Sequence, residues 1–221
     1  MTFSIAARDG GRFGMAVSSS SPAVAARCLH LRPGIGAAAS QNVTDPRLGG
    51  RMLDRLAVHG DAERALKEVG ADATDLDHRQ LTAIGATGPA AWFSGEQTLG
   101  THGAAVGRNS VAAGNMLVDR GLPSVMVEAF ESATGELEQR LLAALRAGHD
   151  AGGEEGPVHS AGLAVVADVE WRVTDLRVDW AEDPIDRLAE TVEVWLPQRD
   201  DYVRRGLAPA TAPSYGVPGD L

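Results

Sequence analysis

The order in which strand and helix patterns follow one another restricts the fold of this chain more than any other feature of its sequence. In strand patterns apolar residues alternate with polar ones or run together, and in helix patterns they recur every three or four positions. The strand patterns cover residues 2–8, 13–19, 35–43, 81–86, 90–94, 104–106, 110–117, 161–166 and 171–178, and the helix patterns cover segments after 45 and 61, 123–132, 136–147 and a segment from 183. Helices and strands do not alternate regularly, as they would around a parallel sheet. The order predicts an α+β fold in which helices cover two mostly antiparallel sheets.

The start of the chain predicts a β-hairpin. Polar and apolar residues alternate from Thr2 to Arg8, and Asp9-Gly10-Gly11 supplies the residues of a turn. The segment 13–19, with the sequence FGMAVSS, is then expected to return antiparallel to the first strand. This pairing carries the serine run 18–21 back toward Thr2.

Two aspartates mark the beginning of helices. Asp45-Pro46 predicts a helix start with proline in the first turn. Asp61 predicts the N-cap of the following helix, because its side chain can accept a hydrogen bond from a free backbone N–H group. We expect both helices to pack an apolar face on a sheet.

Length and composition predict a single domain with a short tail. The chain has 221 residues, of which 44% are hydrophobic, and this is enough to bury one sizeable core. We expect the domain to span residues 1–206. Prolines are frequent in the remaining segment, 207–221, which we expect to form a C-terminal tail.

Charge and cysteine content exclude several classes of partner. Acidic residues outnumber basic ones by 30 to 20, and the formal net charge of -10 repels phosphate backbones and anionic lipids. No apolar run approaches the roughly 20 residues that cross a bilayer. Cys28 has no partner for a disulfide, and the first residues do not form a secretory signal. We expect a cytoplasmic protein that binds neither nucleic acid nor membranes.

Thr2 is the candidate nucleophile. A threonine at the chain start combines a hydroxyl nucleophile with an α-amine, whose pKa of about 7.7–8.0 suits proton transfer near neutrality. Removal of Met1 is expected because threonine is small, although a retained Met1 would turn this amine into an amide. Many chains begin with Met-Thr for reasons unrelated to catalysis. Here Thr2 opens directly into a strand, which would hold both groups in place.

Several segments of the sequence together resemble a bacterial family, domain of unknown function 1028, which is classed with the N-terminal nucleophile hydrolases. The resemblance covers nearly the whole chain. The segments that carry it are Thr2 to Asp9, Gly14 to Ser18, Gly34 to Ala37, His78 to Leu81, Gly114-Asn115 and the tail from Ala212 to Asp220.

The resemblance implies a four-layer αββα sandwich with Thr2 at the mouth between the two sheets. It also implies hydrolysis of a small amide and, because related sandwiches often associate, a homo-oligomer. In the proteasome branch of the superfamily a lysine and an aspartate support the threonine. This chain has a single lysine, Lys67, on an expected helix, so the groups that support Thr2 must differ.

Ser18, Ser20 and Asn115 are the candidates for direct support of the reaction. A hydroxyl of Ser18 or Ser20 would orient the amine or hydroxyl of Thr2, and the alternative is a polar strand end that faces solvent. Asn115 follows Gly114 at the end of an apolar strand. Its amide would donate to a developing oxyanion, and the alternative is an ordinary asparagine at a strand end.

Five further polar residues are candidates for binding the substrate. Gln41 and Asn42 interrupt an otherwise apolar strand. Arg8 and Arg79 would each grip a substrate carboxylate with a bidentate fork, unless they form ordinary ion pairs. His78 would act on the site through Arg79.

No cofactor or metal is expected. The six histidines show no paired metal-binding spacing, and phosphate-binding and nucleophile-elbow motifs are absent. The sequence therefore predicts an amidohydrolase that forms an acyl-enzyme on Thr2. The alternatives are a binding protein that keeps the fold without turnover, and an assembly protein that associates through sheet edges or its tail.

Overall fold

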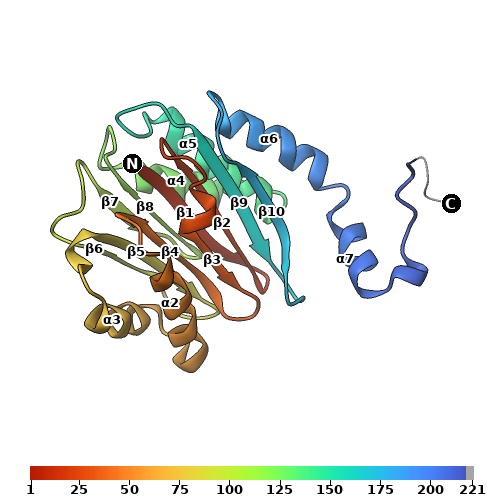
Figure 1. Ribbon diagram of the computed structural model, residues 1–221, viewed down its shortest axis with the longest axis horizontal. Helices are drawn as coiled ribbons and strands as arrows, with labels where there is room; N and C mark the ends of the chain where they lie inside the picture. Colours follow the sequence, from red (N-terminus) through yellow and green to blue (C-terminus); the bar gives the residue numbers. More distant parts are fainter. Residues whose placement is uncertain (218–221) are drawn as a thin grey trace.

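Two antiparallel sheets form the centre of the molecule (Figure 1). The computed structural model describes residues 1–217. The first sheet has six strands in the order β10-β9-β2-β1-β8-β7, with β1 (Thr2–Asp9), β2 (Arg12–Ser19), β7 (Gly103–Val106), β8 (Ser110–Asn115), β9 (Ser160–Val166) and β10 (Arg172–Val178). The second has four in the order β3-β4-β5-β6, with β3 (Leu29–Arg32), β4 (Gly36–Asn42), β5 (Arg79–Gly85) and β6 (Ala91–Ser94).

Helices cover the outer face of each sheet. The four-stranded sheet is covered by α2 (Pro46–His59) and α3 (Ala62–Asp72), and the six-stranded sheet by α4 (Leu122–Ser132), α5 (Leu137–Asp150) and α6 (Pro184–Trp195). The short elements are α1 (Ala25–Cys28), η1 (Leu76–His78), α7 (Arg199–Leu207) and η2 (Pro209–Thr211). Three buried clusters fill the space between the layers, one under each helix layer and one between the sheets. The expected αββα sandwich is confirmed.

Alternation along β1 decides which of its side chains reach each layer. Phe3, Ile5 and Ala7 pack into the cluster under α4, α5 and α6, whereas Ala6 packs into the cluster between the sheets. Because successive side chains on a strand point to opposite faces, Thr2 lies on the same face as Ala6. The start of the chain therefore faces the second sheet.

Both predicted helix starts are confirmed. The Asp45 side chain accepts a hydrogen bond from the backbone N–H of Arg47 at 3.0 Å, and Pro46 is the first residue of α2. The Asp61 side chain caps α3 by accepting from the backbone N–H of Arg64 at 3.0 Å. These local interactions explain why the two helices begin where the sequence predicts.

Several elements differ from the sequence-based expectations, and the edge strand β3 and the short helices α1, η1 and η2 were not predicted. The strand expected over 110–117 ends at Asn115, because Met116 adopts a left-handed backbone conformation with φ of 51°. Helix α7 was not expected, since its short polar sequence buries no residue completely. Arg199 ties it to the domain through hydrogen bonds to Glu136 and Glu138. Of the expected tail, residues 218–221 lie outside the described part of the chain.

Candidate active site

Thr2 lies at the edge of the space between the two sheets and is only 5% exposed. On one side it pairs with Asn115 of β8. On the other side the β1–β2 register pairs Phe3 with Ser18, which brings Thr2 beside Ser19. The central position of β1 in its sheet thus places Thr2 between polar residues of two neighbouring strands.

Two hydroxyl groups meet at one carbonyl oxygen here. The Thr2 Oγ1 and Ser19 Oγ atoms are 3.5 Å apart, and each donates a hydrogen bond of 2.5 Å to the carbonyl oxygen of Met1. Ser19 is completely buried, and its oxygen accepts from the backbone N–H of Ser21 at 3.0 Å. Ser19 therefore holds its hydroxyl in a fixed position, where it donates to the carbonyl group that is bonded to the Thr2 nitrogen.

Four buried side chains form a hydrogen-bonded network that joins the sheets beside Thr2. Ser4 Oγ donates to Gln41 Oε1 at 2.6 Å, and Gln41 Nε2 donates to Gln80 Oε1 at 2.8 Å. Asn115 Nδ2 donates to the same Gln80 oxygen at 3.1 Å. Gln80 Nε2 in turn donates to the backbone carbonyl of Gly114 at 3.0 Å. The network fixes the direction of the Asn115 amide, and Asn115 Oδ1 has no hydrogen-bond partner within the described part of the chain.

Glu154 supplies a carboxyl group at the same end of the sandwich. It is 4% exposed, and its Oε1 atom accepts from the backbone N–H of Ser20 at 2.9 Å. A single β-bridge to Leu117 holds it next to the end of β8. Burial raises the pKa of Glu154 to about 7, although the positive charge of the Met1 amine and the hydrogen bond from Ser20 lower it in part. Its Oε2 atom is buried and has no hydrogen-bond partner among residues 1–217.

Of the residues predicted from sequence, Thr2, Gln41 and Asn115 come together at this site. Ser20 adjoins it through its backbone N–H, which binds Glu154. Ser18 does not join them. It pairs with Phe3, so alternation turns it toward the helix layer, and its hydroxyl donates to the carbonyl of Ser160 at 3.0 Å.

Asn42, Arg79 and His78 lie at the adjoining end of the second sheet and bind backbone groups. Asn42 pairs with Arg79, and its Nδ2 atom donates to the carbonyl of His78 at 2.7 Å. The backbone N–H of Leu99 donates to Asn42 Oδ1 at 3.2 Å, and the Arg79 guanidinium donates to the carbonyl of Val43. In this structure these groups hold loops together at the margin of the site.

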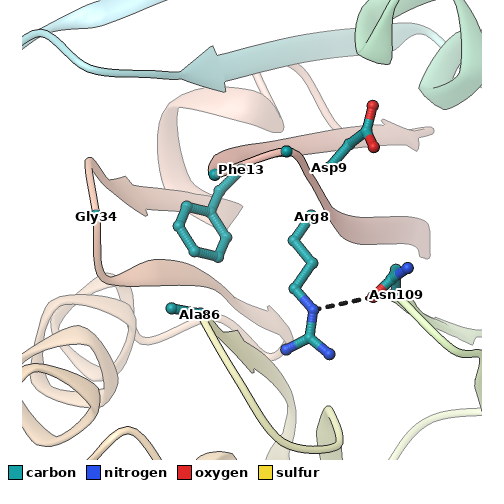
Figure 2. Close-up of a pocket in the computed structure, with 8 residues that line it drawn as sticks. Arg8, Asp9, Phe13, Gly34, Ala86 and Asn109 are labelled. Carbon is teal, nitrogen blue, oxygen red and sulfur yellow. Dashed lines mark hydrogen bonds between the residues drawn. The ribbon is translucent and has the colours of Figure 1, made fainter.

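Arg8 lies next to Asp9 at the turn end of the hairpin (Figure 2), whereas Thr2 begins the other end of β1. Arg8 is six residue steps along the strand from Thr2, which corresponds to about 20 Å. The Arg8 guanidinium donates to Asn109 Oδ1 at 3.1 Å and to the carbonyl of Gly85 at 2.8 Å. It borders a separate pocket, which Phe13 also lines. The structure therefore does not bring Arg8 to the candidate site.

Three residues of the site were not predicted from the sequence, namely Ser19, Gln80 and Glu154. A signal existed for Ser19, since a hairpin whose turn is Gly10-Gly11 pairs Asp9 with Arg12 and hence sets Thr2 beside Ser19. No such signal existed for the other two. Gln80 reaches the site from another sheet, and Glu154 reaches it from a glycine-rich loop.

The fold and the site define an α+β protein of the four-layer αββα class, with a buried threonine at the mouth between its sheets. The chain belongs to the family of unknown function DUF1028, whose profile matches residues 2–188. The crystal structure of protein SPO2555 from Silicibacter pomeroyi, which carries the same family assignment, is 30% identical to it. That likeness has a TM-score of 0.84 and covers 92% of this chain and 94% of the other.

Two other solved structures resemble the chain more distantly, each at 14% identity over 75% of this chain and 98% of the other. One is eukaryotic HslV from Trypanosoma brucei, with a TM-score of 0.46, and the other is BPH of Thiobacillus denitrificans in complex with epoxomicin, with a TM-score of 0.38. No curated protein matches the chain. Within residues 1–217, no helix is long and apolar enough to span a bilayer, and no three acidic, histidine or cysteine side chains are grouped to bind a metal.

Proposed function

We propose that this protein is an amidohydrolase that hydrolyses a small amide through an acyl-enzyme on Thr2. One observation carries the proposal. The Thr2 and Ser19 hydroxyls, both buried, converge on the carbonyl oxygen of Met1. A substrate carbonyl placed there would lie next to a nucleophile and next to a donor for its oxygen.

The proposed reaction begins when Met1 has been removed and Thr2 carries a free α-amine. The Thr2 Oγ1 atom attacks the amide carbonyl, and the α-amine accepts the hydroxyl proton directly or through one water. The proton passes to the leaving amine as the carbon–nitrogen bond breaks. Water then hydrolyses the ester on Thr2 and regenerates the hydroxyl, so the reaction needs no other co-reactant.

We assign the support of the developing oxyanion to Ser19 and Asn115. Ser19 already donates to a carbonyl oxygen beside Thr2. Asn115 lies opposite Thr2, and one hydrogen of its Nδ2 atom is used by Gln80, which leaves the second available to the substrate. Gln41 and Gln80 then act as positioning residues, because they touch Asn115 or each other and not the reacting atoms.

The test compares Thr2→Ser and Thr2→Ala in protein whose loss of Met1 is verified by intact mass. The serine variant is expected to keep measurable turnover of small amides, lactams or acylated amino acids, and the alanine variant to lose it. A β-lactone is expected to label Thr2 in the active protein. Turnover by the alanine variant, or a mature chain that keeps Met1, would refute the assignment.

A further inference from the structure

Met1 fills the space in front of Thr2, and its surroundings indicate what that space accepts. Its carbonyl oxygen is held by the hydroxyls of Thr2 and Ser19. Its side chain lies over Gly156, where an added Cβ would be 3.4 Å from Met1 Cε and 3.9 Å from Met1 Sδ. The positive charge of its amine acts on the Glu154 carboxyl from a distance, because the two groups form no direct ion pair or hydrogen bond in the described part of the chain. The carbonyl of Met1 is thus bound by two hydroxyls, its side chain lies over a glycine, and its amine lies within the field of an acid to which it is not bonded.

The position of the methionyl group on the Thr2 nitrogen indicates where an acyl group on the Thr2 oxygen would lie. The two positions interconvert through a five-membered ring in which the carbonyl carbon is bonded to both atoms of the same threonine. The carbon therefore moves little between them, and its substituents remain in the same region. The contacts of Met1 consequently outline the pocket for the acyl half of a substrate.

Glu154 is the residue near Met1 that can carry a negative charge. One carboxyl oxygen accepts from the backbone N–H of Ser20, and the other is buried and has no hydrogen-bond partner among the residues that the structure describes. A buried polar atom without a partner is costly, and such atoms commonly mark a place where a ligand or ion completes the bonding. An ammonium group has the charge and the donors to do so.

We propose that the acyl half of the substrate is an α-amino acid with a free amino group, which binds Glu154 while an unbranched side chain lies over Gly156. This inference rests on the proposed function of Thr2. The products would be the free amino acid and the amine released from it. Water supplies the oxygen of the new carboxylate, so the balance of the reaction is that of simple amide hydrolysis.

Binding to a protein without the nucleophile tests this substrate class apart from turnover. In Met1-free Thr2→Ala protein, calorimetry is expected to show methioninamide binding at least tenfold more tightly than N-acetylmethioninamide, because acetylation removes the positive charge. Adding Glu154→Gln is expected to abolish this preference. Glutamine keeps an oxygen for the N–H of Ser20, so the local fold has the means to persist.

The residue that follows Glu154 in the sequence provides a matched control. Glu155 is exposed, and Glu155→Gln in the same background is expected to leave the preference unchanged. Equal binding of the two amides, including no binding of either, would overturn the proposal, as would a preference that survives Glu154→Gln. If Glu154 instead binds the α-amine of residue 2, Glu154→Gln would weaken the binding of both amides equally. That result would also overturn the proposal. These results are separate from the Thr2→Ala turnover assay, which alone tests the nucleophile.

Discussion

Thr2 and Asn115 lie directly opposite each other on the adjacent antiparallel strands β1 and β8. Side chains in this relation are neighbours on one face of a sheet, with their Cβ atoms about 5 Å apart. The face is the one that looks toward the second sheet, since Asn115 donates to Gln80 of β5. A nucleophile and an amide donor are therefore held together by backbone pairing, and a third strand sets the direction of the amide.

Asn115→Ala is expected to reduce kcat by about 10²- to 10³-fold, the usual effect of removing one oxyanion donor, with a much smaller change in KM. Steady-state kinetics on the best amide found with the wild type measure both constants. Asn109→Ala is the control, because Asn109 binds Arg8 at the other end of the sheet and is expected to leave kcat unchanged. A kcat within twofold of wild type for Asn115→Ala would remove this residue from the mechanism.

Ser19→Ala and Ser18→Ala are expected to have different effects, because the two side chains point to opposite faces of β2. Loss of the Ser19 hydroxyl is expected to lower kcat by about 10²-fold. Loss of the Ser18 hydroxyl is expected to leave kcat intact and to lower the free energy of unfolding by about 1 kcal/mol, since it breaks one hydrogen bond to Ser160. Kinetics and urea unfolding of both variants separate these outcomes, and equal kinetic effects would contradict the assignment of faces.

Gln80→Leu is expected to lower the free energy of unfolding by about 2–6 kcal/mol. The change leaves the donors of Gln41 and Asn115 buried without their acceptor, and each such group costs about 1–3 kcal/mol. Gln198→Leu is the control, because Gln198 is exposed and its bond to Val194 lies on the surface, where substitutions change stability by about 0.5 kcal/mol or less. Urea unfolding measures both, and similar values for the two variants would mean that the network does not stabilise the sandwich.

Glu154→Gln is expected to flatten the dependence of stability on pH. The folded protein holds the Glu154 proton up to a pKa of about 7, whereas the unfolded chain releases it near 4.5. The folded state therefore binds more protons between these values, and the wild type loses stability as the pH rises from 4.5 through 7. The loss is up to about 3 kcal/mol. Thermal unfolding of both proteins at pH 5 and pH 8 measures it. An identical pH dependence in the variant would show that Glu154 does not titrate in this way.

The amino-acid sequence alone determined the features of this protein that depend on near neighbours. Alternation from Thr2 to Arg8 and the glycines at 10 and 11 specify the first hairpin, as the register of β1 and β2 confirms. Asp45 and Asp61 specify the starts of α2 and α3 through bonds to residues two or three positions away. The order of these elements was sufficient to predict two mostly antiparallel sheets covered by helices.

Only the tertiary structure decided which side chains share the space around Thr2. Gln80 and Glu154 come from segments remote in sequence, and sheet packing and a single bridge bring them there. Ser19 faces that space and Ser18 does not, because the two faces of a strand alternate and one step of register exchanges them. Arg8 shares a strand with Thr2 yet lies at its far end, since an extended chain separates residues by over 3 Å per step. Sequence patterns encode local conformation, whereas a site is assembled by long-range contacts that no local pattern records.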